Sequence, residues 1–299
     1  MPSAAESAVA AVPPCPFVVL DEIASGGMGT VYRARAVTGP HAGRVVALKR
    51  LHPHLARDPH VAAMFVEEAR ILAGLRHPNV VRVVDCGVDD VGPYIALDYV
   101  AGVSVADVMR VARAKRKLVP LGVVARVLAE TADGLHAAHE LTDASGALRH
   151  LVHRDVSPQN ILLGFDGAVV LIDFGVAKVR DAVAHTRTGV VKGKLAYMSP
   201  EQVQGKPIDH RTDVFALGVV LWEVLTLHRL FRGETEMETI QHVLHDPVEP
   251  VGGLRPDLPA ALDALLFATL AKDPDQRIAS AAEFATELRR ITANEPADG

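Results

Sequence analysis

Strand-forming and helix-forming segments are sharply segregated along this chain. The first third contains short runs rich in β-branched and aromatic residues, separated by Gly, Pro and Asp, which predicts strands. Beyond Gly102 the apolar residues recur with the period of a helix. This order favours an α+β fold with a boundary near Asp98–Gly102. The predicted strands are Phe17–Leu20, Val31–Tyr32, Val45–Leu48, Val80–Val84 and Tyr94–Leu97, followed by Ile161–Leu163 and Val169–Ile172.

One helix is expected inside the strand-rich part, over Pro59–Leu75. Positions 61, 65, 68, 72 and 75 share one of its faces, and four of them are apolar. The fifth is Glu68, whereas Glu67 lies at the edge of that stripe. An unpaired charge inside a protein is costly, so Glu68 is expected to have a partner. Later helices are predicted over Leu121–Leu141, Val214–Leu227, Glu236–Leu244, Ala260–Ala271 and Ser280–Ile291.

Charge and cysteine content exclude several classes of protein. A formal net charge of −5 and an isoelectric point near 6.3 argue against a general nucleic-acid binder. The basic run from Arg110 to Lys117 is interpreted as a solvated helix face. The two cysteines, Cys15 and Cys86, form no CxxC pair, which fits a reducing, cytoplasmic location.

The ends of the chain and its apolar runs predict no targeting or membrane segment. The longest uncharged apolar run, Val214–Trp222, is too short to span a membrane before Glu223 interrupts it. The N-terminus carries Glu6 and lacks a basic segment, so no secretory signal is expected. Residues 1–16, rich in Ala, Pro and Ser, are predicted to be a flexible leader, and residues 291–299 a frayed tail.

Two motifs in the middle of the chain point to chemistry. Residues 153–160 read HRDVSPQN, and residues 173–175 read DFG directly after a predicted strand. They resemble the catalytic loop and the metal-binding segment of protein kinases. The resemblance implies that Asp155 accepts the proton of the attacking hydroxyl. It also implies that Asn160 and Asp173 hold Mg²⁺, which prefers hard oxygen ligands.

The first third carries a nucleotide-binding pattern. The stretch from Ile23 to Val31 reads IASGGMGTV, which is similar to the glycine-rich loop of protein kinases with Ala24 at the first glycine position. Glycines let the backbone approach phosphates and present N–H donors. The stretch Val46–Lys49 reads VALK and resembles the kinase strand motif whose lysine contacts the α- and β-phosphates of ATP. In that family a helical glutamate pairs with the lysine, which gives Glu68 its partner.

The same resemblance places the adenine of ATP by position. It implies that Val31, Ala47 and Leu162 sandwich the base, that Leu97 is the gatekeeper, and that the backbone of Asp98 and Val100 hydrogen-bonds it. The complete set of expected ATP contacts is Ile23, Ala24, Ser25, Gly26, Gly27, Met28, Gly29, Val31, Ala47, Lys49, Glu68, Leu97, Asp98, Val100 and Leu162.

Further matches are expected to be structural rather than chemical. Ser199-Pro200-Glu201 occupies the place of the kinase APE motif, and Arg277 resembles the arginine that pairs with its glutamate. Asp213 begins a segment like the central kinase helix. His153 and Phe174 are expected to be internal packing residues.

The resemblance covers residues 17–290. The motifs GGMGTVY and YMSPEQ are similar to those of bacterial Ser/Thr kinases of the Hanks type. The motifs HRDVSPQN and VKGKLAYMSPEQ resemble those of myxobacterial kinases. It implies a two-lobed kinase fold with ATP in the cleft. The small, β-rich N-lobe would cover residues 17–98 and contain one main helix. The larger helical C-lobe would cover residues 103–290. The implied activity is transfer of the γ-phosphate of MgATP to Ser or Thr hydroxyls of protein substrates.

Two departures from the family pattern keep alternatives open. Ser157 stands where Ser/Thr kinases carry a lysine, and Lys194 stands where they carry a threonine. We hypothesise that Lys194 reaches back to pair with Asp155 and neutralises the transferring phosphate. The lost lysine and Ala24 would also fit a pseudokinase that binds nucleotide without turnover. A small-molecule phosphotransferase can share the D-x-x-x-x-N loop, but the APE-like segment argues against it.

The segment between Gly175 and Ser199 resembles a kinase activation loop. It contains Thr186 and Thr188, and an arginine before the catalytic aspartate, Arg154 here, commonly binds a phosphate on that loop in the family. A phosphothreonine pairs well with arginine. Autophosphorylation at Thr186, Thr188 or both is therefore expected, and a homodimer that phosphorylates in trans is compatible with it.

Overall fold

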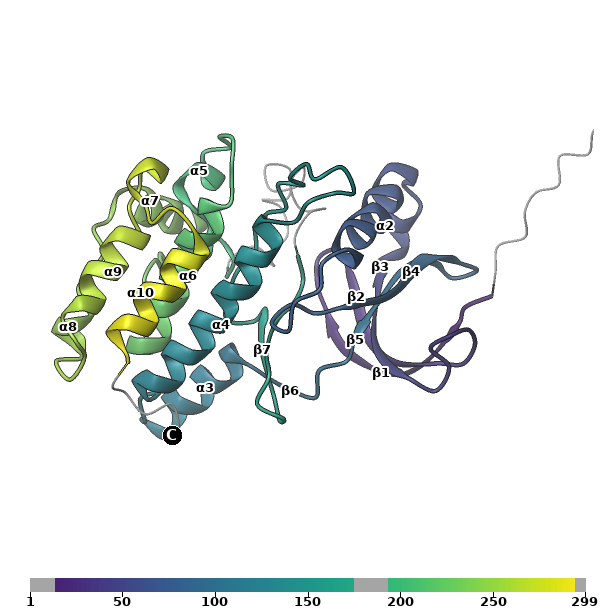
Figure 1. The fold of residues 1–299 in the computed structure, drawn as a ribbon, viewed down its shortest axis with the longest axis horizontal. Coiled ribbons are helices and arrows are strands. Elements are labelled where there is room, and N and C mark those ends of the chain that lie inside the picture. Colours follow the sequence, from purple (N-terminus) through teal and green to yellow (C-terminus); the bar gives the residue numbers. More distant parts are fainter. Residues whose placement is uncertain (1–13, 175–192, 294–299) are drawn as a thin grey trace, which may run out of the picture. The chain divides into compact units, whose positions relative to one another are not determined.

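The computed structural model describes residues 14–174 and 193–293, so the predicted phosphosites Thr186 and Thr188 lie outside the described residues. The chain forms two compact units. Met1–Ala73 and Arg82–Tyr99 make up the N-terminal unit, and Gly74–Val81 and Val100–Gly299 make up the C-terminal unit. A sheet dominates the first unit and helices dominate the second (Figure 1), so the α+β prediction is confirmed.

An antiparallel sheet forms the body of the N-terminal unit, with the strand order β1-β2-β3-β5-β4. Helices α1 and α2 lie between β3 and β4 in the chain. The bounds are β1 (Phe17–Ser25), β2 (Gly29–Ala36), β3 (Val45–Leu51), α1 (Pro53–Ala56), α2 (Pro59–Ala73), β4 (Val83–Asp89) and β5 (Gly92–Asp98).

Alternation along β3 gives this sheet two apolar faces. Val46 and Leu48 are fully buried in a cluster on one face. Leu51 packs on the other face with apolar residues of α2. Because successive side chains of a strand point to opposite faces, Ala47 and Lys49 belong to the face that α2 covers.

Helix α2 follows the predicted stripe. Phe65, Leu72 and Glu68 are buried, whereas Glu67 is exposed. The helix ends at Ala73, two residues before the predicted end. The helical period therefore predicted correctly that Glu68, and not its neighbour Glu67, is buried.

Helices and a small sheet of order β6-β7-β8 build the C-terminal unit. Helix α4 packs against α6 and α10 (Figure 1). The bounds are β6 (Gly102–Ser104), α3 (Val105–Lys115), α4 (Leu121–His139), β7 (Ile161–Gly164), β8 (Val169–Leu171), η2 (Leu195–Tyr197), α5 (Pro200–Val203), α6 (Arg211–Thr226), α7 (Glu236–His245), α8 (Val251–Leu254), α9 (Ala261–Thr269), η3 (Pro274–Gln276) and α10 (Ala281–Ile291).

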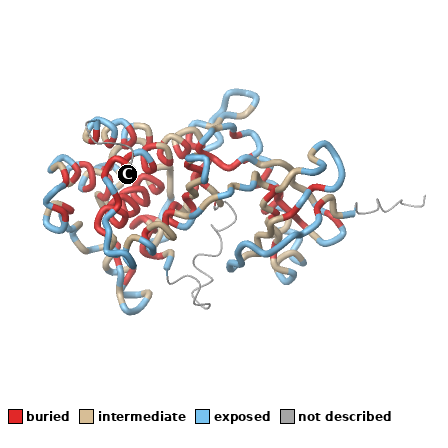
Figure 2. Tube along the Cα trace, turned by 90° about the horizontal axis from the view of Figure 1, so that it is seen from below, coloured by how far each residue is buried: buried red, intermediate tan, exposed pale blue. Residues whose placement is uncertain are grey.

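Helix α6 is the core of this unit, and every residue from Thr212 to Thr226 is buried. A helix that is apolar on all sides needs neighbours all round it. Figure 2 shows the buried residues concentrated along the helices of the C-terminal unit, whereas buried and exposed residues mix in the strands. Within the described residues, no helix combines the length and apolarity that crossing a membrane requires.

Several predicted boundaries were wrong because tertiary contacts override local propensity. The run Val80–Val84 is not one strand, since β4 begins only at Val83. Val80 instead forms an isolated bridge with Leu171 of the C-terminal unit, to which it belongs. The apolar residues of this run are therefore divided between the two units.

The predicted bounds of the leader and the tail also need correction. Pro16 accepts a hydrogen bond from the backbone of Val37, so the leader is already attached at its last residue. Thr292 is buried and donates to Leu288 at 2.8 Å, so the tail does not begin at residue 291. The interpretation of the basic run is confirmed, because its basic residues Arg110, Arg113, Lys115, Arg116 and Lys117 are all exposed; Arg113 also donates to the carbonyl of Leu227 at 2.6 Å.

Candidate active site

The catalytic loop is held by a carboxylate from α6. Asp213 accepts hydrogen bonds from the backbone N–H groups of His153 and Arg154, both at 2.8 Å, and from His139 Nε2 at 2.8 Å. Burial alone would raise the pKa of Asp213, but its hydrogen bond and charge contact with His139 hold it below its usual range. A buried charge with this many donors fixes the loop backbone, where Arg154 adopts a left-handed φ of 66°.

His153 is a neutral spacer beneath the loop. It is fully buried, and burial lowers its pKa. Its Nε2 lies 3.0 Å from the carbonyl oxygen of Ile172, while its Nδ1 accepts from the backbone of Asp155 at 3.2 Å. Its ring packs on that of Phe174 with the ring centres 4.5 Å apart. The prediction that both aromatic residues are packing residues is confirmed.

Asn160 fixes the carboxylate of Asp155. Its Nδ2 donates to the backbone carbonyl of Asp155 at 2.7 Å and to Oδ2 of the same residue at 3.1 Å. The amide is thereby oriented, and its Oδ1 accepts no hydrogen bond from the described residues. An oriented amide oxygen is a hard ligand of the type that Mg²⁺ prefers.

Asp173 supplies the second hard oxygen donor of the predicted metal pair. It follows β8 and has a left-handed φ of 63°, a conformation that Asp tolerates better than most residues. Together, Asn160 and Asp173 are a donor set that fits Mg²⁺, which keeps several waters and binds substrate phosphates.

Lys194 reaches the catalytic loop. Its Nζ lies 2.6 Å from Oδ2 of Asp155, and the side chains are 34% and 9% exposed. The predicted contact is therefore present in the structure. Ser157 is buried, and its Oγ has no hydrogen-bond partner among the described residues.

A buried ion pair anchors the segment that carries Lys194. Arg277 donates through both terminal nitrogens to Glu201, each at 2.7 Å, and Thr212 donates to the same carboxylate at 2.8 Å. Burial alone would raise the pKa of Glu201, but the guanidinium of Arg277 keeps it low. The predicted pairing of Arg277 with Glu201 is confirmed.

The glycine-rich stretch of the N-terminal unit joins β1 to β2. Ile23, Ala24 and Ser25 end β1, and the backbone N–H of Gly26 donates to the carbonyl of Gly29 at 2.9 Å. Residues Ile23–Gly27 are exposed. A Cβ on Gly29 would lie 2.0 Å from the carbonyl oxygen of Arg50, so only glycine fits there.

Lys49, Val31 and Leu97 come together on β2, β3 and β5. Val31 pairs with Lys49 across β2 and β3, and Ala47 pairs with Leu97 across β3 and β5. The buried Glu68 lies on α2, which covers the same face of the sheet. The predicted phosphate-contacting lysine and its predicted glutamate thus belong to one face.

The predicted adenine contacts are strand and linker positions. Asp98 ends β5, and its backbone N–H donates to the carbonyl of Arg82 at 3.0 Å. Val100 follows in the C-terminal unit, where Leu162 lies on β7 opposite Val170. Within the described residues, neither backbone group of Val100 makes a hydrogen bond to another backbone group.

Known proteins resemble the chain over nearly its whole length. Residues 17–288 match the family model described as the protein kinase domain. The chain belongs to the protein kinase family.

Its relatives are bacterial kinases. The tyrosine-protein kinase MasK of Myxococcus xanthus is 43% identical over 91% of this chain and 42% of that protein. The serine/threonine-protein kinase PknB of Mycobacterium tuberculosis is 36% identical over 91% of this chain and 42% of that protein. This kinase chain thus spans about two fifths of the length of the curated relatives.

Solved structures agree with the fold. The crystal structure of the Mycobacterium tuberculosis PknI kinase domain has a TM-score of 0.69 and 28% identity, and the match covers 95% of this chain and 98% of that chain. The prediction of a bacterial kinase similar to the Hanks-type and myxobacterial enzymes is confirmed.

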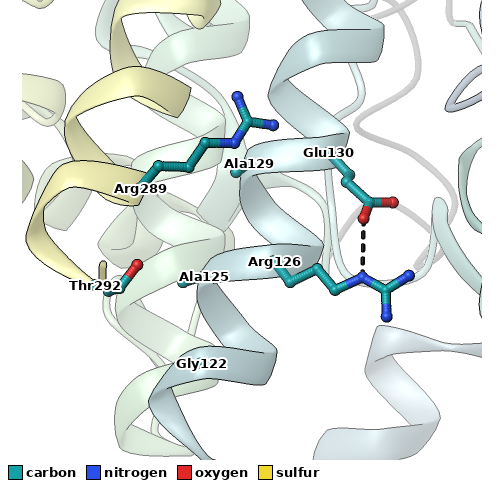
Figure 3. A pocket seen from close by; sticks show the side chains of 7 residues that line it. All are labelled: Gly122, Ala125, Arg126, Ala129, Glu130, Arg289 and Thr292. Carbon is teal, nitrogen blue, oxygen red and sulfur yellow. Dashed lines mark hydrogen bonds and ion pairs between the residues drawn. The ribbon is translucent and has the colours of Figure 1, made fainter. Parts of the chain in front are cut away.

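The C-terminal unit of this kinase also contains a pocket of about 250 Å³, which is lined by residues of α4 and of the end of α10. Arg126 and Glu130 of α4 form an ion pair at its edge (Figure 3). Arg289 of α10 also lines it and pairs with Asp133. None of the predicted site residues lines this pocket, and its arginines already pair with carboxylates.

Sequence reasoning missed two supports of the kinase site. His139, at the end of α4, was not singled out, although it holds Asp213. Tyr197 was also missed as an anchor, although its hydroxyl donates to the buried Glu223 at 2.7 Å. The only available signal was Glu223 itself, a charge within an apolar helix, which required a partner.

Proposed function

We propose that this chain is an active protein kinase that transfers the γ-phosphoryl group of ATP to Ser or Thr hydroxyls of proteins. The arrangement around Asp155 carries this proposal: a carboxylate oriented by Asn160, close to the cation of Lys194, on a loop fixed by Asp213. Catalysis of phosphoryl transfer depends mainly on positioning and on stabilising charge, and this arrangement supplies both.

The reaction follows from these groups. The substrate hydroxyl oxygen attacks the γ-phosphorus, the bond from that phosphorus to the β,γ-bridging oxygen breaks, and ADP leaves. Asp155 orients the hydroxyl and takes its proton. Lys49 is assigned to the α- and β-phosphates, and the exposed glycine stretch to the phosphate backbone contacts. When bound, Mg²⁺ would neutralise phosphate charge, and Asn160 with Asp173 would hold it.

We assign the kinase domain to residues 17–290 and regulation to the loop that contains Thr186 and Thr188. Phosphorylation there would place nearly two negative charges within reach of Arg154 and order the loop. Trans-autophosphorylation in a homodimer would produce this state. Protein substrates in the cytoplasm are the acceptors that fit this proposal.

The test is to incubate the purified chain with MgATP and a generic protein substrate, and to map phosphosites by mass spectrometry. Wild type should label Ser and Thr residues, with Thr186 or Thr188 among them. Asp155→Asn and Lys49→Met should lower the rate at least about a hundredfold while the fold remains intact. Equal labelling by wild type and Asp155→Asn would contradict the proposal and favour a nucleotide-binding pseudokinase.

A tyrosine acceptor is the second candidate, and two observations favour it. The relative MasK is named a tyrosine-protein kinase, and the lysine typical of Ser/Thr kinases is replaced here by Ser157. The identity of the phosphorylated residue in the same experiment decides between the two acceptors. Phosphotyrosine alone would replace the Ser/Thr assignment and would leave the kinase assignment in place.

A further inference from the structure

We propose that Lys194 supplies the cation that the catalytic loop lacks at Ser157, positioning Asp155 and contacting the transferring phosphoryl group. This inference rests on the proposed kinase function. It deepens that function, because it names which residue takes the role of a missing one at the same site.

The contact itself is the first argument. Lys194 Nζ lies 2.6 Å from Asp155 Oδ2, which makes this a short charge-assisted hydrogen bond. Asn160 donates to the same oxygen at 3.1 Å. Two donors from different segments fix the plane of this carboxylate, as a group that orients a hydroxyl requires.

The backbone that carries Lys194 is fixed, which is the second argument. Lys194 immediately precedes η2, whose residues Leu195–Tyr197 are all buried. The hydroxyl of Tyr197 donates to Glu223 of α6, and the carbonyl of Lys194 accepts from the backbone of Tyr197 at 3.0 Å. A lysine with such an anchored backbone is a preorganised donor.

Ser157 occupies the position at which the catalytic loop lacks a cation. It lies on the catalytic loop with the backbone of Asn160 donating to its carbonyl at 3.0 Å, and its Oγ is buried without a partner in the described part of the chain. A hydroxyl carries no charge with which to neutralise a phosphate. Lys194 is 34% exposed, so its ammonium can meet an arriving phosphate while it stays near Asp155.

In the reaction, Lys194 holds the ionised carboxylate of Asp155 while that carboxylate receives the proton of the substrate hydroxyl. As the bond between the γ-phosphorus and the bridging oxygen breaks, negative charge spreads over the equatorial oxygens. The ammonium of Lys194 stabilises this charge and keeps its own protons. Its loss should therefore lower kcat more than it weakens the binding of MgATP.

The experiment compares Lys194→Met, which keeps an unbranched side chain of similar size but removes the charge, with Lys194→Arg and with Lys206→Met at an exposed lysine of the same unit. The readouts are kcat and KM for a peptide substrate that the wild type phosphorylates, the affinity for MgATP by calorimetry, and Tm. Lys194→Met should lower kcat about ten- to a thousandfold and change MgATP affinity less than about threefold. Lys194→Arg should keep kcat within about tenfold of wild type, and Lys206→Met should match wild type.

A double variant that moves the lysine from position 194 to position 157 tests whether Lys194 replaces the cation missing at Ser157. Lys194→Thr should be as impaired as Lys194→Met, and Ser157→Lys/Lys194→Thr should recover at least about tenfold of that loss. Additive effects in this cycle, a loss of kcat below about tenfold in Lys194→Met, or a higher kcat in that variant would overturn the proposal. If Ser157→Lys does not fold, as Tm would show, Lys194→Met and Lys194→Arg still decide.

Failure of the Lys194 role and failure of the kinase function would give different results. An active wild type with a fully active Lys194→Met removes only the role of Lys194. A wild type that labels substrate no better than Asp155→Asn removes the kinase function, and this inference with it.

Discussion

In the C-terminal unit, buried charged side chains hold the catalytic loop, whereas in the N-terminal unit mainly backbone hydrogen bonds and glycine hold the turn that we assign to phosphate contacts. Asp213 fixes two N–H groups of the catalytic loop, and the pair Arg277–Glu201 anchors the segment behind Lys194. In the glycine stretch, the backbone N–H of Gly26 donates to Gly29, and His52 bonds to the carbonyls of Met28 and Gly26, while residues 23–27 are exposed. A site that aligns reacting atoms needs fixed geometry, while a turn that receives phosphates needs its N–H groups accessible.

The largest effect should come from breaking a buried charge pair. Arg277→Met leaves Glu201 buried without its cation, because their side chains are 0% and 7% exposed. We expect the free energy of unfolding to fall by about 3–5 kcal/mol. Urea unfolding would measure this. Arg290→Met, at an exposed pair with Glu287, is the matched control and should change stability by less than about 0.5 kcal/mol.

The next effect tests the glycine turn. Gly29→Ala places a Cβ 2.0 Å from the carbonyl oxygen of Arg50, so β2 and β3 must separate locally. We expect a loss of about 1–3 kcal/mol in the free energy of unfolding, together with weaker MgATP binding. Gly27→Ala, with nothing within 4 Å of the added Cβ, should be close to wild type in stability. Equal stability losses in the two variants would show that the contact of the added Cβ with the carbonyl oxygen of Arg50 does not cause the loss.

A smaller effect distinguishes the two glutamates of α2. Glu68 is buried on the face that also presents Lys49, whereas Glu67 is exposed and pairs with Arg70. Glu68→Gln should lower kcat/KM about tenfold, since it would remove the charge that we assign to orienting Lys49. Glu67→Gln should leave it unchanged. Similar kinetics in the two variants would refute the assignment of Glu68.

The last effect depends on pH. Burial lowers the pKa of Lys272 to about 8, although its Nζ donates to Val243 and lies 4.4 Å from the ring centre of Phe231. An unfolded lysine has a pKa near 10.4, so between these values the unfolded chain binds the extra proton. The stability of wild type relative to Lys272→Met should therefore increase as the pH rises from about 8 to about 10. Denaturant unfolding across this range would check it, and a pH-independent difference would contradict it.

Sequence patterns and motif order determined the fold class, the order of strands and helices, and the identity of the candidate site residues. Helical periodicity alone separated Glu68 from Glu67, because each residue's face follows from its position in a regular helix. The resemblance of HRDVSPQN and DFG to protein-kinase motifs singled out Asp155, Asn160 and Asp173.

Only the tertiary structure decided which distant charges meet. His139 and Asp213 are 74 residues apart in the sequence, and nothing local to either pairs them. Packing also divided the apolar run Val80–Val84 between two units. Lys194 was a candidate from its position, but its contact with Asp155 depends on how α6 anchors η2. Local periodicity is set by neighbouring residues, whereas ion pairs across a core are set by long-range packing, where an unpaired buried charge is too costly to persist.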